Sequence, residues 1–124
     1  MYCLTTNLWG RDFELKVYME HCSDEEVLPL QNRALEALTQ SWQTVENSLE
    51  AVKRFCIENN GQEITERPIS NIFKYVMPQA LYVTRSSQER VILLCAYRFD
   101  MEHGIGVEFV NNELGRIDQQ DKLI

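Results

Sequence analysis

Three ionisable side chains fall within four residues near the end of the chain, in the stretch FDMEHGIGVEF. Asp100, Glu102 and His103 carry the oxygen and nitrogen donors that hold metal ions or move protons. Gly-Ile-Gly follows at once, and glycine permits the positive φ angles of turns and bulges. The stretch could therefore be a metal or acid–base site, or a turn between two strands.

Turn chemistry accounts for most of these residues. Asp favours the first position of a turn, because its carboxylate accepts hydrogen bonds from nearby backbone N–H groups. Consecutive Glu102 and His103 on a strand would point to opposite faces, so only a bulge would bring them together. We therefore interpret Asp100, Glu102, His103 and Gly104 as a structural turn motif. A metal-binding or metal-dependent enzyme site at Asp100, Glu102 and His103 is the alternative.

Other signs of catalysis or metal binding are weak in this sequence. It contains no GxSxG, P-loop, HExxH or GxGxxG motif. Its four cysteines are far apart, with no CxxC pair and no short Cys/His spacing. We expect a protein that is not an enzyme and that binds no cofactor or metal.

Composition and charge narrow the classes of partner. The chain has 124 residues, is 44% hydrophobic and 25% charged, and has a net charge of −7. These values are typical of one globular domain, here expected over residues 1–124. The sequence lacks the basic stripe that direct nucleic-acid binding needs, but an acidic surface can attract a basic partner. With no long apolar run and no secretory signal, we expect a cytoplasmic protein that does not bind membranes.

The hydrophobic pattern divides the chain into three zones. Alternating Phe13, Leu15, Val17 and Met19 predict a strand with one buried face, in a hairpin with a strand near residues 3–8. Apolar stripes at helical spacing then predict two to three helices over residues 24–77. The acidic SDEE is expected at the helical start, and PISNIFKYVMP as a short third helix that Pro78 ends.

Residues 79–124 are expected to be rich in strands. ALYVTR, RVILLCAYRF and GVEFV are strand candidates, and the VILLC run is apolar enough to be buried on both faces. Strands, then helices, then strands predict an α+β fold. We expect an antiparallel sheet, formed by an N-terminal strand or hairpin and a C-terminal β-meander, with two to three helices packed on one face.

The C-terminal stretch YRFDMEHGIGVEFVNNELGRIDQQDKLI resembles the signature of a family of small uncharacterised bacterial domains. The pattern is Asp-x-Glu-His-Gly, an alternating strand, Phe-x-Asn, an Ile step and Gln-Asp. The matching positions are Asp100, Glu102, His103, Gly104, Phe109, Asn111 or Asn112, Ile117, Gln120 and Asp121. LWGRDFELKVYME, Gln31 at a helix start and VMPQALYV are also similar in placement. Asp118 departs from the pattern, where Gly is expected after the Ile.

Some proteins that resemble this family are encoded beside toxin genes, in contact-dependent growth inhibition and related polymorphic toxin systems. The resemblance implies an immunity protein that binds its cognate toxin domain and blocks the toxin's active site. A basic nuclease is a toxin that an acidic inhibitor would suit. A regulatory domain that binds a different protein is the other alternative. The expected toxin contacts are acids of the helical zone: Asp24, Glu25, Glu26, Glu46, Glu50 and Glu58, with Glu63 and Glu66 nearby.

Overall fold

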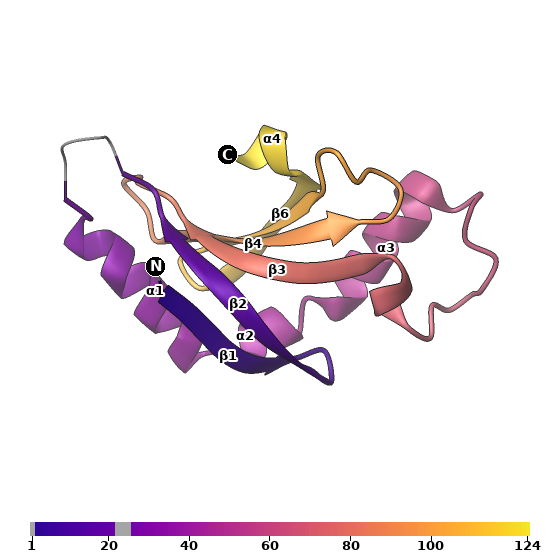
Figure 1. Cartoon of the computed structure of the whole chain (residues 1–124), viewed down its shortest axis with the longest axis horizontal. Helices are drawn as coiled ribbons and strands as arrows, with labels where there is room; N and C mark the ends of the chain where they lie inside the picture. The colour runs from indigo at the N-terminus through magenta and orange to yellow at the C-terminus, as the bar shows by residue number, and fades with distance from the viewer. Residues whose placement is uncertain (1, 22–25) are drawn as a thin grey trace.

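The computed structural model describes residues 2–21 and 26–124 and contains one six-stranded sheet (Figure 1). The strands lie side by side in chain order: β1 (Tyr2–Leu8), β2 (Arg11–Met19), β3 (Val76–Val83), β4 (Arg90–Tyr97), β5 (Ile105–Val110) and β6 (Glu113–Gln119). Neighbouring strands are antiparallel except for the parallel pair β2–β3, which the helical segment connects. The predicted α+β class, N-terminal hairpin and C-terminal meander are confirmed.

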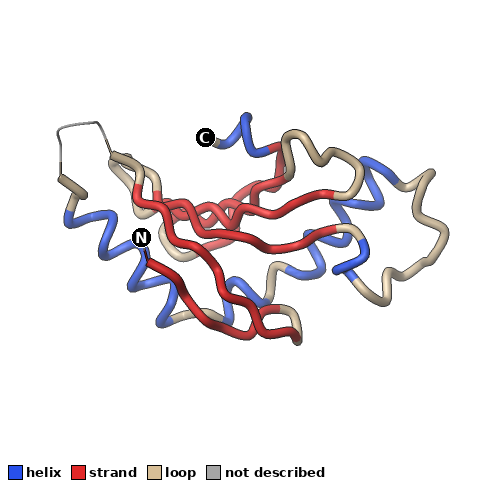
Figure 2. The backbone as a smooth tube through the Cα atoms, viewed as in Figure 1, coloured by secondary structure: helices blue, strands red, loops and turns tan. Residues whose placement is uncertain are grey.

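Three helices connect β2 to β3 and cover one face of the sheet (Figure 1). They are α1 (Pro29–Gln40), α2 (Gln43–Glu46) and α3 (Leu49–Asn60). Figure 2 shows a loop between α3 and the single 3₁₀ turn η1 (Ile72–Lys74) that precedes β3. A four-residue helix that the sequence did not predict, α4 (Gln120–Leu123), lies on the opposite face, where Leu123 packs near Gly106 and Ile92.

Two boundaries in the helical zone were predicted wrongly. The first helix starts at Pro29, after the acidic residues, and no acidic side chain lies in its first turn. Proline suits this first helical position because its missing N–H would have no partner there. The expected third helix is reduced to η1, and Val76–Pro78 belong to β3. A residue that precedes proline is pushed to extended backbone, which explains why Met77 joins the strand.

A buried glutamine fixes the start of α1 to the sheet. Gln31 is 1% exposed, and its side-chain oxygen accepts a hydrogen bond of 2.8 Å from the backbone N–H of Leu28. Its amide nitrogen donates to the backbone oxygens of Glu20 and Val83, at 2.7 and 3.3 Å. One side chain therefore joins the N-terminus of α1 to the ends of β2 and β3.

The core lies between the helices and the sheet. The central strand β4 is buried on both faces, as predicted: Val91, Ile92 and Leu93 are each at most 2% exposed. In β2, Leu15 and Val17 are buried while Glu14 and Lys16 are exposed, which is the predicted alternation. The core joins buried side chains from every layer, among them Leu8, Leu15, Leu38, Val45, Val52, Leu81, Leu93, Val107 and Phe109.

The contact between β2 and β3 is short. Only four residue pairs join them, from Lys16↔Ala80 to Met19↔Val83. Before Lys16 and Ala80 the two strands separate (Figure 1), and aromatic side chains pack between the hairpin and η1. Phe73 of η1 packs against Phe13 and Trp9, with ring centroids 5.5 and 6.2 Å away.

Candidate functional site

The predicted turn motif lies in the connection between β4 and β5, and Asp100 is its centre. The Asp100 carboxylate accepts hydrogen bonds from the backbone N–H of His103, at 3.2 Å, and from the side-chain amide of Gln119, at 2.7 Å. His103 Nδ1 lies 3.1 Å from Asp100 Oδ1, so the two side chains form an ion pair when the imidazole is protonated. The end of β6 thus supports the turn between the two preceding strands.

These contacts change the proton affinities of both partners. The Gln119 amide is the largest cause that lowers the pKa of Asp100, because its hydrogen bond favours the ionised carboxylate. The Asp100 carboxylate raises the pKa of His103, and the charges of Asp121 and Glu102 act in the same direction. The turn therefore gathers three carboxylates around one imidazole that gains a proton easily.

Gly104 and Gln120 form a second connection within the same motif. Gly104 has a φ of +65°, and a Cβ there would lie 2.6 Å from both the Cys95 carbonyl oxygen and the Gln120 amide nitrogen. That amide donates to the carbonyl oxygens of Cys95, at 3.1 Å, and Ile105, at 3.3 Å. Gln120 therefore joins the end of β4 to the start of β5 across space that only glycine leaves open.

The alternative metal site was expected to use Asp100, Glu102 and His103. Over residues 2–21 and 26–124, no group of three His, Cys, Asp or Glu side chains is arranged to hold a metal ion. The side chains of Asp100 and His103 are in contact. The other side chain that contacts the Asp100 carboxylate is the amide of Gln119, where the metal site would need a third ligand such as Glu102. The geometry supports a hydrogen-bonded pair at this turn.

The C-terminal end of α3 lies beside this turn. Asn60 accepts a 2.6 Å hydrogen bond from the Tyr97 hydroxyl, and burial is the main cause that raises the pKa of that phenol. A hollow of about 350 Å³ lies between the two segments, lined by Asn59, Asn60, Tyr97, Phe99, Asp100, Ile105, Asp118, Gln119 and Lys122. A second hollow of about 430 Å³ shares Asn59 and Asn60 and adds Glu58, Glu63 and Arg67.

Carboxylates outnumber cations over these two hollows. Glu58, Glu63, Asp100 and Asp118 line them, against Arg67 and Lys122. Glu102 and Asp121 lie close enough to raise the pKa of His103. We call this region the acidic end, defined by Glu58, Glu63, Asp100, Glu102, Asp118 and Asp121.

The six acids expected to contact a toxin do not form one cluster. Asp24 and Glu25 lie outside the described residues. Glu26 is exposed before α1, whereas Glu58 is in the last turn of α3, and these two helix ends lie at opposite ends of the molecule (Figure 1). Between them, Glu46 is half-buried in α2 and Glu50 forms a 3.8 Å ion pair with Lys53. Among the described members of the expected set, Glu58 belongs to the acidic end and Glu26, Glu46 and Glu50 do not; Glu63, expected nearby, also belongs to it.

Sequence reasoning missed how the acidic end is assembled. In the sequence, Asp118 was noted as a departure from the signature and Asp121 as one of its matching positions, and nothing indicated that Gln119 contacts Asp100. The available signal was the signature itself, because its Gly104 and Gln120 meet in the structure although they are far apart in sequence.

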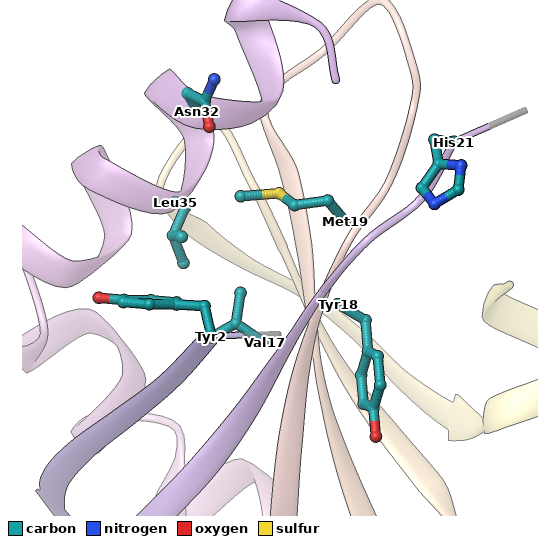
Figure 3. Close-up of a pocket in the computed structure, with 7 residues that line it drawn as sticks. All are labelled: Tyr2, Val17, Tyr18, Met19, His21, Asn32 and Leu35. Atoms are coloured by element: carbon teal, nitrogen blue, oxygen red, sulfur yellow. The ribbon is translucent and has the colours of Figure 1, made fainter. Parts of the chain in front are cut away.

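Another hollow lies elsewhere, and it is mostly apolar. It has a volume of about 690 Å³ and lies between the start of the β1–β2 hairpin and α1. Figure 3 shows Tyr2, Val17, Met19 and Leu35 around it, while Tyr18 points away, across the sheet. Asn32 and His21 are its polar residues.

Comparisons with known proteins identify the family of the chain. In the described part, no helix is both long enough and apolar enough to cross a membrane. Neither the curated proteins nor the solved structures include a significant match. Residues 2–124 match the family model of a domain of unknown function, DUF6985. The match covers nearly the whole sequence, and the chain therefore belongs to the DUF6985 family.

Proposed function

We propose that this protein is an immunity protein that neutralises a bacterial toxin domain by binding the toxin's basic active-site cleft with its acidic end. The observation that carries the proposal is the concentration of carboxylates around two adjoining hollows. A net charge of −7 on 124 residues adds a long-range attraction to any basic partner. The resemblance of the C-terminal signature to domains encoded beside toxin genes supports the same function.

The position of Glu58 supports a binding role for this end. Glu58 is in the last turn of α3, where there is no basic residue. The partial negative charge of a helix C-terminus disfavours a carboxylate there, typically by about 0.3–1 kcal/mol. The Arg67 guanidinium, which donates to the Gly61 carbonyl oxygen at 2.6 Å, offsets part of this repulsion, and a basic partner would add a further favourable contact.

An exposed apolar side chain lies between two of these acids in the sequence. Met101 is 71% exposed, between Asp100 and Glu102 in the β4–β5 connection. Protein interfaces often combine an apolar centre with a charged rim, and methionine adapts easily to the surface that it meets. Its side chain lines a small hollow with Lys74 and Arg98, at the border of the acidic end. Met101 is therefore the expected anchor at that border, and the carboxylates of the acidic end provide attraction and orientation.

The test uses the toxin domain encoded beside the gene of this protein, with binding kinetics and growth protection as readouts. Glu58→Gln with Glu63→Gln should lower the association rate constant about tenfold or more at low salt, because charge steers the encounter. The matched control, Glu36→Gln with Glu113→Gln, removes the same charge from exposed positions on α1 and β6. It should change the rate constant by less than about threefold.

The dissociation rate tests the anchor separately. Met101→Ser should speed dissociation about tenfold, since truncating an interface anchor acts mainly on that rate. The control is Leu114→Ser on β6, which truncates a 39% exposed apolar side chain away from the hollow that Met101 lines. Failure of the wild type to bind and protect would refute the immunity function. Equal effects of both charge pairs would instead refute the placement of the interface.

A further inference from the structure

The two edges of the sheet differ in their protection against pairing with another strand. At one edge, β6 carries Glu113, Arg116 and Asp118, and its register with β5 is irregular. At the other edge, β1 reads YCLTTNL, with no charged residue, proline or glycine. Charges, prolines and bulges are the usual protection of edge strands, and a regular uncharged edge is open to strand addition.

The register of the hairpin identifies the backbone groups at this edge. Leu8 pairs with Arg11 across the two-residue turn Trp9-Gly10, so these two residues form a hydrogen-bonded pair. Even-numbered residues of β1 therefore direct their N–H and C=O groups toward β2. The odd-numbered residues Cys3, Thr5 and Asn7 direct theirs outward.

A side-chain contact agrees with this assignment and limits the open part of the edge. The indole N–H of Trp42 donates a 2.9 Å hydrogen bond to the backbone oxygen of Asn7. Trp42 therefore covers the end of β1 near the turn. The open stretch is centred on Leu4, with Cys3 and Thr5 on either side.

We propose that β1 pairs in antiparallel orientation with β1 of a second copy of this chain, about a two-fold axis beside Leu4. In this register Cys3 of each copy lies opposite Thr5 of the other. Their N–H and C=O groups form four intermolecular hydrogen bonds, and these use the outward groups on both sides of Leu4. Leu4 then meets Leu4 of the second copy in a closely spaced pair.

Self-complementarity favours a second copy as the partner. A two-fold interface needs one patch that matches itself, and this stretch has one outward-facing residue on each side of a central leucine. No charged side chain lies in β1, so like charges do not face each other across the pairing.

The neighbouring groove would contribute apolar contacts to the same interface. Tyr2 is 54% exposed and lines the groove with Leu35 (Figure 3). In the proposed register, Asn7 of the second copy lies just beyond Tyr2. The Trp42 bonded to that Asn7 would approach the Tyr2 ring and cover it. The dimer thus buries the largest exposed aromatic side chain at this edge.

Sedimentation velocity of the whole chain tests the proposal, at about 5–200 µM protein, in reductant so that the exposed Cys3 cannot cross-link. The wild type should form a dimer within this range. Its dissociation constant should fall at higher salt, because two copies with net charge −7 repel each other. Salt should weaken the proposed toxin complex, so the two interactions respond in opposite directions.

Thr5→Pro removes an outward N–H without touching the β1–β2 ladder, and proline is tolerated at such edge positions. It should weaken the dimer at least tenfold, whereas Thr5→Val, which keeps the N–H, should not. If circular dichroism showed Thr5→Pro to be misfolded, Cys3→Pro would replace it at the equivalent outward position. A wild type that stays monomeric at 200 µM in both salts overturns the proposal, and so does equal dimerisation of Thr5→Pro and Thr5→Val.

Discussion

Replacing Gly104 with alanine should lower the stability of the protein for two reasons, which can be measured separately. The first is conformational, since an L-residue in the left-handed region costs about 1–2 kcal/mol. The second is steric, since the new Cβ would lie 2.6 Å from the Cys95 carbonyl oxygen and the Gln120 amide nitrogen. Overpacking of this kind typically costs about 1–3 kcal/mol. Gly104→Ala should therefore lower the free energy of unfolding by about 2–5 kcal/mol.

Gly10 provides a matched control. Its φ is +87°, but nothing lies within 4 Å of a Cβ built there. Gly10→Ala should cost only the conformational part, about 1–2 kcal/mol. Urea denaturation followed by circular dichroism measures both variants, with the denaturant slope compared to verify that the unfolded states are similar.

A double-mutant cycle then assigns the steric part. Gln120→Ala removes two hydrogen bonds and should cost about 1–3 kcal/mol by itself. In that background Gly104→Ala should be about 1 kcal/mol less harmful than in the wild type, because only the Cys95 oxygen still blocks the Cβ. Equal costs for Gly104→Ala and Gly10→Ala, or strict additivity with Gln120→Ala, would refute this account of the signature.

Two further predictions concern the buried glutamine and the turn. Gln31→Leu should lower the free energy of unfolding by about 2–4 kcal/mol, because buried backbone groups at three strand and helix ends lose their partner; Gln40→Leu, on the exposed side of the same helix, should change it by less than about 0.5 kcal/mol. His103→Gln should destabilise the protein more near pH 5.5 than near pH 8.5 in thermal melts. The raised pKa of His103 adds stability below its unfolded value, which is lost as pH rises through the folded pKa, whereas the lowered pKa of Asp100 adds stability above its own unfolded value. A pH-independent difference between wild type and variant would contradict this.

The strands were predictable where local pattern and burial coincide. Alternation in β2 and the apolar run of β4 each report which faces the sheet buries, and both predictions are confirmed. The prediction of a third helix was wrong because the apolar spacing over residues 69–77 fits a helix, whereas Val76 and Met77 pair with β4 as part of β3. The short helix α4 has no local signal; Leu123 is held there by the space over Gly106.

The candidate site was less predictable, because it is assembled from distant segments. Glu58 and Asp118 line adjoining hollows only because α3 ends beside the β4–β5 turn, and no periodicity encodes that contact. Gln31 was placed at a helix start by resemblance, but its role depends on the backbone of Val83. Sequence similarity marked the important positions, while the structure supplied their partners.

The short pairing between β2 and β3 affects how the native structure opens locally. Four residue pairs join the N-terminal hairpin to the rest of the sheet, whereas seven join the two strands of the hairpin itself. A fluctuation that breaks these four pairs releases a complete ribbon and leaves the ladders of the C-terminal meander intact. We therefore expect a partial opening of the native state in which residues 2–19 undock, breaking the Trp9–Phe73 and Phe13–Phe73 contacts and exposing the buried Leu8 and Leu15. Hydrogen exchange of amides in the C-terminal strands would then report global unfolding. Exchange of the amides that join β2 to β3 would report this partial opening.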